Sequence, residues 1–258
     1  MKREYIKLIA LICLAVTVLC GCGSKKDTHY IPTGTDASEP TLSESARKLY
    51  QYETPKEGDL CADIEILGHG HIYVKLFKEE AGYAVDNFVE KAKKGEYDGT
   101  YVSDASEGYY LQAGKPLTDD TKEESIWGGG FSDEISEDLY TTRGALCMAN
   151  QGTDGTNAMQ FFFVTAGKDL VNSLAKPLGE HYNMTLRDYL KTNYGTSLTD
   201  AQLARYLTYG GAPWLYGHNT VFGQVFRGYD VMDEVCSLRA SGEEAIYVKK
   251  VVIYEYVD

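Results

Sequence analysis

Two side-chain amides, Asn150 and Gln160, are the residues whose type and spacing best suit a ligand site. They stand where two apolar runs, residues 145–149 and 161–164, meet a loop rich in Gly, Thr, Asp and Asn, a pattern that predicts strand, loop and strand. An amide both donates and accepts hydrogen bonds, and the apolar runs would supply a floor between the two amides. Apolar walls with a few fixed polar groups are typical of ligand sites, and here they favour an extended peptide.

The elements that must position these amides are predicted from alternation and from helical spacing. Residues 60–67 and 72–77 alternate like strands and flank a Gly-His-Gly-His turn, and residues 246–256 alternate again. Apolar residues recur at helical spacing from 84 to 92, and Gly95 stands where such a helix would stop. We therefore expect a helix that covers one side of a sheet.

The net charge argues against nucleic acid as a partner, and the pattern of histidines argues against a metal site. The formal net charge of -13 makes nucleic acid an improbable partner. His69 and His71 in the predicted turn can be read as metal ligands or as solvent-exposed turn residues. Because no further ligands accompany them, we expect no metal site.

The first 22 residues have the features of a bacterial lipoprotein signal peptide. A basic start precedes an apolar stretch, residues 8–19, which is short for a membrane span. Residues 19–22, Leu-Cys-Gly-Cys, resemble the lipobox, in which the last cysteine, here Cys22, is lipidated and becomes the N-terminus. We expect the protein to be anchored to the cell membrane through Cys22, facing the extracytoplasmic side. An uncleaved anchor helix is the alternative.

Residues 23–57 are rich in Ser, Thr, Asp, Lys and Pro, which predicts a flexible tether of some ~30 Å. The folded domain is expected to span residues 58–258 as a monomer. Its three cysteines, Cys61, Cys147 and Cys236, cannot all pair with one another, so no disulfide framework is expected.

A succession of short motifs resembles the cyclophilin family of peptidyl-prolyl isomerases. Each motif is weak alone, but their order along residues 59–256 is specific. The motifs are Tyr97-Asp-Gly-Thr100, Gly108-Tyr-Tyr-Leu-Gln-Ala-Gly114, Ile126-Trp-Gly128, Phe131-Ser-Asp-Glu134, Gly144-Ala-Leu-Cys-Met-Ala-Asn150, Gln160-Phe-Phe162, Thr220-Val-Phe-Gly-Gln-Val225 and Gly228-Tyr-Asp-Val-Met-Asp233.

This resemblance implies a mostly β fold, namely a closed eight-stranded antiparallel barrel capped by two helices, residues 84–94 and 229–238. The alternating run at residues 246–256 would close the barrel and remove its open edge. It also implies a groove for proline-containing polypeptide segments, without a cofactor. The residues that would line the proline pocket are Tyr109, Tyr110, Phe162 and Leu215. The residues that would hold the peptide backbone and its flanking residues are Gln112, Ala149, Asn150, Gln160 and Trp214.

Isomerisation of a prolyl bond needs little chemistry. The barrier of ~18–20 kcal/mol comes from amide resonance, and a donor aimed at the proline nitrogen of the twisted amide lowers that barrier. The family uses an arginine there, but an ungapped alignment places Asp104 at that position. An ionised carboxylate only accepts hydrogen bonds, so we expect weak activity or none, with peptide binding kept.

Several residues are candidates to replace the missing donor. We favour Gln112 and Asn150, and leave open Ser103, Arg143 and Asn219, the last of which stands where the family has a histidine.

A second departure from the family is an insertion near residues 172–210. Its apolar spacing predicts helices, with Thr199 as an N-cap and Gly210 at a helix end. Because the insertion adjoins Trp214, it would either form a lid over the groove or be a surface elaboration that packs its own tyrosines. Both interpretations stay open.

Three classes of function are compatible with the sequence. The favoured one is a prolyl isomerase of reduced activity that assists the folding of exported proteins at the cell envelope. The alternative is a catalytically inactive cyclophilin-like module that binds proline-containing peptides. The third is an unrelated solute-binding lipoprotein.

Overall fold

The computed structural model describes residues 49–117, 123–182, 184–242 and 246–257. The predicted signal peptide, the lipobox with Cys22 and most of the predicted tether lie outside these residues. Within the described ranges, no helix combines the length and the apolar character that crossing a membrane requires.

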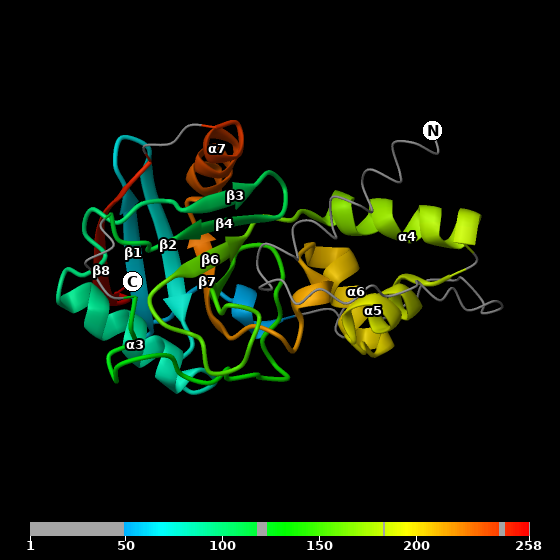
Figure 1. Cartoon of the computed structure of the whole chain (residues 1–258), viewed down its shortest axis with the longest axis horizontal. Helices are drawn as coiled ribbons and strands as arrows, with labels where there is room; N and C mark the ends of the chain where they lie inside the picture. Colours follow the sequence, from blue (N-terminus) through cyan, green and yellow to red (C-terminus); the bar gives the residue numbers. More distant parts are fainter. Residues whose placement is uncertain (1–48, 118–122, 183, 243–245, 258) are drawn as a thin grey trace.

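One antiparallel sheet of eight strands forms the body of the protein (Figure 1). The strands lie side by side in the order β3-β4-β6-β5-β7-β2-β1-β8. Their bounds are β1 Leu60–Ile66, β2 Gly70–Leu76, β3 Asp104–Ser106, β4 Tyr110–Ala113, β5 Ala145–Met148, β6 Phe161–Val164, β7 Val221–Arg227 and β8 Val248–Glu255. The strands that the apolar runs predicted, β5 and β6, are confirmed and pair directly with each other.

The sheet curls into an open half-barrel, so the eight antiparallel strands are confirmed and the predicted closure of the barrel is not. Its end strands, β3 and β8, form no ladder with each other among the described residues. The chain just before β3 does hydrogen-bond to the start of β8: Val248 N donates to Thr100 O at 2.8 Å, and Val102 N donates to Ile246 O at 3.0 Å.

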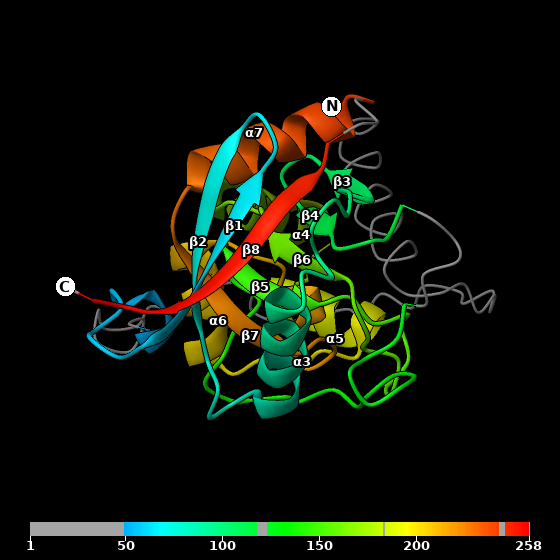
Figure 2. The same cartoon turned by 90° about the vertical axis from the view of Figure 1, so that its left-hand side faces the viewer.

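Two helices lie at opposite ends of the curled sheet, one at the top and one at the bottom of Figure 2. They are α3, Gly82–Lys93, and α7, Tyr229–Ala240, close to the two predicted capping helices. α3 buries Phe88 in an aromatic group with Phe161 and Phe222, at centroid distances of 5.5 and 5.4 Å. This group belongs to the inner core, so Phe161 lies on the face of β6 that points inward.

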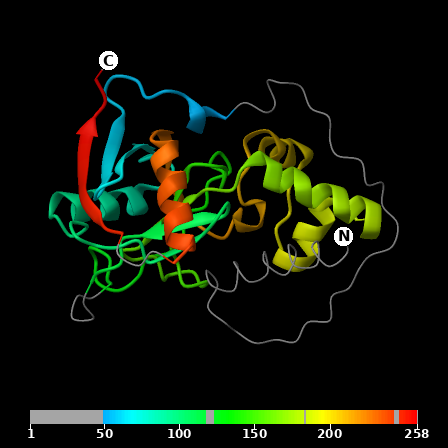
Figure 3. The ribbon, with the colours of Figure 1, turned by 90° about the horizontal axis from the view of Figure 1, so that it is seen from above.

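Three further helices form the insertion and lie on the side of the sheet away from α3 and β8 (Figure 3). They are α4 Lys168–Tyr182, α5 Leu186–Tyr194 and α6 Asp200–Tyr209. Thr199 caps α6 through a capping box with Gln202, and Gly210 ends it, as predicted. The helical segment begins at Lys168, earlier than the predicted residue 172.

The two ends of the insertion meet. A Cβ atom on Gly210 would lie only 2.5 Å from the carbonyl carbon of Gly167 and from the nitrogen of Lys168. Gly210 also has a φ of 75°, a left-handed value that favours glycine. The chain therefore leaves the body and returns to it at one point, as expected for an added subdomain.

The described part of the predicted tether packs against the body. A short 3₁₀ helix, η1 (Tyr50–Tyr52), buries Gln51, whose amide nitrogen donates to Tyr140 O, Thr142 Oγ1 and Gln224 Oε1 at 2.9–3.1 Å. The Tyr52 ring stacks on Tyr209 of α6 at 4.3 Å. Packing against the body thus extends at least as far as Leu49, the first described residue. The polar composition of residues 23–57 did not indicate this packing, because the hydrogen-bond partners of the buried Gln51 lie far away in the sequence.

Candidate functional site

The outer face of strands β4, β5 and β6 carries several of the residues predicted to form the groove. Gln112 on β4 and Cys147 on β5 are both register partners of Phe162 on β6. Directly opposed residues in a sheet point to the same face, and the alternate residues Leu111 and Phe163 belong to the inner core. The sheet therefore brings Gln112 and Phe162 together on its outer face.

A cluster of polar side chains forms one end of this face. Gln160 accepts two hydrogen bonds at Oε1, from Ser103 Oγ and from Gln112 Nε2, both at 2.9 Å. Its amide nitrogen donates to Glu123 Oε2 at 2.5 Å. These bonds fix which way the Gln160 amide points, with its oxygen toward β3 and β4 and its nitrogen toward Glu123.

Asp104 lies on the same face as these amides. It begins β3 and is the register partner of Gln112. Its Oδ2 accepts a 2.7 Å hydrogen bond from the hydroxyl of Tyr110, and its Oδ1 accepts from Ala105 N at 2.9 Å. Burial, followed by the bond to Asp104, raises the pKa of Tyr110 well above its ordinary value. Tyr110 therefore stays a donor, and Asp104 serves as an acceptor.

The residues predicted to line the proline pocket are brought together and are covered. They are Tyr109, Tyr110, Phe162 and Leu215, and together with Trp214 they have exposed fractions between 0% and 5%. The rings of Tyr109 and Trp214 lie 6.1 Å apart. All five belong to one apolar cluster with residues of the insertion, such as Leu186 and Leu190 of α5.

The cover comes from the insertion and the segment that follows it. Trp214 and Leu215 lie on a 3₁₀ helix, η2 (Pro213–Leu215), which contacts α5. Thr196, just after α5, has its hydroxyl 3.3 Å from Trp214 O and 3.2 Å from His218 Nε2. The insertion thus packs against the segment that carries two of the predicted pocket residues.

The side-chain amide of Asn150 links two loops, those that contain Asp133 and His218. Its nitrogen donates to Asp133 Oδ2 at 3.0 Å and to His218 O at 2.9 Å, which uses both amide hydrogens. Next to it, Ala149 N donates to Gln160 O at 3.0 Å. Asn219 is buried and donates to Met148 O at 3.3 Å. In this structure the side-chain amides of Asn150 and Asn219 therefore make hydrogen bonds within the protein.

Two acidic residues that the sequence analysis missed organise these loops. Asp133 also accepts from Asn157 Nδ2 at 2.8 Å and from Thr220 Oγ1 at 3.2 Å. Glu134 accepts from the backbone nitrogens of Tyr83 and Ala84, at 3.1 and 2.9 Å, and so caps the start of α3 from a distance. Their position in the Phe-Ser-Asp-Glu motif was the only signal in the sequence.

The remaining candidate donors face other partners. Arg143 donates to Thr165 O and pairs with Asp233 of α7, each at 2.5 Å. Ser103 is bonded to Gln160, as described above. The carbonyls of Val102 and Ser103 accept from Arg239 of α7, at 3.1 and 3.0 Å. Among the described residues, Arg143 and Arg239 thus bond to groups other than the side chain of Asp104.

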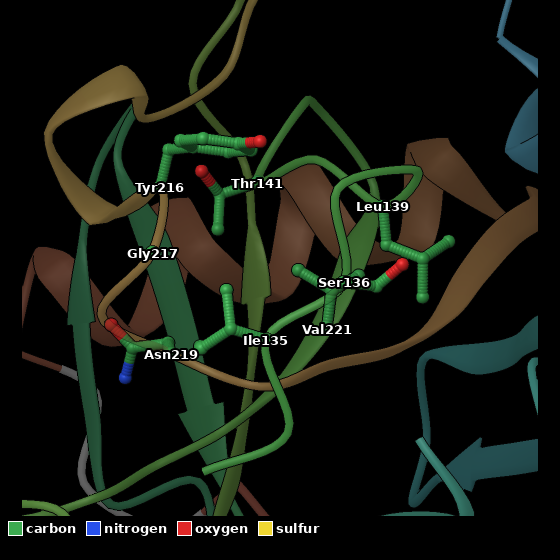
Figure 4. A pocket seen from close by; sticks show the side chains of 8 residues that line it. All are labelled: Ile135, Ser136, Leu139, Thr141, Tyr216, Gly217, Asn219 and Val221. Carbon is green, nitrogen blue, oxygen red and sulfur yellow. The ribbon is translucent and has the colours of Figure 1, made fainter. Parts of the chain in front are cut away.

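A small pocket lies beside the segment that comes directly after η2 (Figure 4). It is lined by Ile135, Ser136, Leu139, Thr141, Tyr216, Gly217, Asn219 and Val221. Its free space is about 10 Å³, which is roughly the room that one water molecule needs. It contains Asn219 but none of the other predicted groove residues, and it is too small for a proline ring.

The fold is thus a curled antiparallel sheet of eight strands with side-chain amides along the outer face of β4 and at the end of β6. Residues 61–186 match the family model described as cyclophilin type peptidyl-prolyl cis-trans isomerase/CLD. The chain belongs to this family.

Relatives and solved structures agree with this assignment. A Staphylococcus aureus (strain USA300) protein assigned as a peptidyl-prolyl cis-trans isomerase is 31% identical over 185 residues, which cover 70% of this chain and 85% of the relative. A Staphylococcus haemolyticus protein assigned in the same way is 32% identical over 175 residues, which cover 68% and 80%.

The solved structures are more distant in sequence. A Cryptosporidium parvum cyclophilin type peptidyl-prolyl cis-trans isomerase has a TM-score of 0.55 and 21% identity, and the match covers 77% of this chain and 99% of that one. The same protein in the presence of the dipeptide Ala-Pro has a TM-score of 0.54. These structures support the fold.

Proposed function

We propose that this protein is a peptidyl-prolyl cis-trans isomerase of reduced activity that acts on proline-containing segments of exported proteins. Membership of the cyclophilin family supports the reaction. The observation that best supports a reduced rate is the hydrogen bond from Tyr110 to Asp104. In this bond the residue that we align with the family's arginine accepts a hydrogen bond and does not donate one.

The mechanism that we propose depends on a neutral donor. In the twisted amide the proline nitrogen regains a lone pair, and an N–H directed at it stabilises that state. Gln112 is our first candidate, because its amide nitrogen carries two hydrogens and gives one of them to Gln160. Asn150 is the second candidate, and it would first have to release Asp133 or His218.

The test is a prolyl-peptide isomerisation assay on residues 23–258. We expect a rate about 10²–10³ below that of an arginine-bearing relative, and a further loss in Gln112→Ala. A rate equal to that of the relative would refute the role given to Asp104. Unchanged activity in Gln112→Ala, with activity lost in Asn150→Ala, would assign the donor to Asn150.

The alternative function is a module that binds prolyl peptides without turnover. The cover over Phe162 and Trp214 and the acceptor at position 104 favour it. Titration of the protein with a prolyl peptide, followed by NMR line shapes at the proline, separates the two. Binding without accelerated exchange between cis and trans peptide would establish the alternative.

The anchoring and the assembly state are also proposals. We propose that Cys22 is lipidated, that residues 23–48 tether the domain, and that the domain is monomeric outside the cytoplasm. In the producing cell, Cys22→Ser should move the protein from the membrane fraction to the soluble fraction. We further propose that the bonds between residues 99–102 and 246–248 complete the barrel, which predicts slow hydrogen exchange at the amides of Val102 and Val248.

A further inference from the structure

The hydroxyl of Tyr109 is buried without a hydrogen-bond partner among the described residues. The residue is 5% exposed, and its Oη is one of the buried polar atoms left unpaired. Burial raises the pKa of this phenol above its ordinary value. The hydroxyl therefore keeps its proton at neutral pH and remains available as a donor.

Three other buried phenols among the described residues have partners, whereas the hydroxyl of Tyr50 is, like that of Tyr109, without one. Tyr97 donates to Met159 O at 3.0 Å, Tyr110 donates to Asp104, and Tyr206 shares a 2.9 Å bond with Thr141. A buried hydroxyl that lacks a partner costs stability, because it gives up its bonds to water. A phenylalanine would fill the same space at Tyr109 without that cost, so the hydroxyl itself calls for an explanation.

The position of Tyr109 associates this hydroxyl with the groove. The ring packs 6.1 Å from Trp214 and lies in the same apolar cluster as Phe162 and Leu215. The backbone groups of Tyr109 are satisfied, since its N–H donates to Ser106 O at 2.9 Å and its carbonyl accepts from Thr165 N at 3.0 Å. The side-chain oxygen is the polar atom that remains.

We propose that the Tyr109 hydroxyl donates a hydrogen bond to a carbonyl oxygen of the bound prolyl segment. The inference rests on the proposed function and adds a ligand contact to it. Tyr109 transfers no proton, because rotation about the amide requires none. Its role is to pair with a main-chain acceptor inside an otherwise apolar pocket and so to fix the register of the peptide.

The test compares Tyr109→Phe with the unmodified chain for affinity toward a short prolyl peptide and for thermal stability. We expect the affinity to fall about two- to tenfold, the range of one hydrogen bond. The midpoint of unfolding should stay equal or rise, because the variant removes an unpaired buried group. Tyr97→Phe is the matched control from the inner core, and it should show a lower midpoint with unchanged affinity.

Modified peptides identify the acceptor. One peptide ends in prolinol and lacks the proline carbonyl, and the other carries sulfur in place of oxygen on the carbonyl before proline. If Tyr109→Phe loses no further affinity for one of them, that carbonyl is the partner. Equal affinity of both proteins for every peptide would overturn this inference and leave the proposed function standing. Failure of the unmodified chain to bind any prolyl peptide would overturn both.

Discussion

The hydroxyl of Tyr110 donates a 2.7 Å hydrogen bond to Oδ2 of Asp104, across the strand pair β3 and β4. This bond holds the side chain of Asp104 beside Gln112, on the face where the groove is predicted. If the ungapped alignment with the family's arginine holds, the charge at this point is opposite to that of an arginine-bearing cyclophilin.

Restoring the cation should restore activity. In Asp104→Arg we expect the isomerisation rate to rise at least about tenfold, because one directed donor in a shielded site is worth ~10²–10³ in rate. The control is Asp104→Ala, which removes the charge and adds no donor. An equal rise in both variants would mean that repulsion by the carboxylate, and not the missing donor, limits the rate.

Loosening the insertion should make the groove easier to enter. Thr196→Val removes the hydroxyl that contacts Trp214 O and His218, at a cost of about 0.5–1.5 kcal/mol. We expect peptide association, measured by stopped-flow fluorescence, to become a few times faster. Thr208→Val, which removes a hydroxyl bonded within α6 to Ala204 O, should leave the association rate unchanged.

A larger change tests the same role of the insertion. Since Gly167 and Gly210 are in contact, a chain that joins them directly removes residues 168–209 with little change in path. If the insertion is a lid, peptide affinity should change in this deletion variant. Unchanged association in Thr196→Val together with unchanged affinity in the deletion variant would favour a surface elaboration.

The N-terminal segment should contribute to stability. Gln51→Ala leaves Tyr140 N, Tyr140 O and Gln224 Oε1 without their present partner, and we expect a loss of at least about 2 kcal/mol. For a domain of this size that corresponds to a fall of roughly 4–8 °C in the unfolding midpoint. Calorimetry measures it, with the exposed Lys56→Ala as the control. Equal midpoints would show that η1 packs without stabilising the body.

Stability should fall at alkaline pH. Burial raises the pKa of Tyr52, Tyr97 and Tyr206 above the ordinary value, so these phenols stay protonated in the folded chain when they would ionise in the unfolded chain. The unfolded state then binds fewer protons, and the free energy of unfolding decreases as pH rises above about 10, by ~1.4 kcal/mol per pH unit for each such tyrosine.

Urea unfolding at pH 8, 10 and 11 measures this loss. Tyr97→Phe should make the decline shallower, because it removes one of the ionising groups. Midpoints that do not change between pH 8 and pH 11 would contradict the prediction.

Local patterns were sufficient for many elements. The apolar runs predicted β5 and β6, and Thr199 with Gly210 marked the two ends of α6, because strand alternation and helix capping depend on residues close in sequence. The docking of Gln51 was not predictable in this way, since its partners lie 89 or more residues away.

The sequence by itself determined the family, the kinds of side chain available to the groove, and the carboxylate at position 104. Only the tertiary structure decided how those groups are used. It paired Asp104 with Tyr110, directed the amide of Asn150 at Asp133, and placed Phe162 beneath the insertion. The physical reason is that a residue's chemistry is fixed by its own atoms, while its partners and its burial depend on strand register and on packing between distant segments.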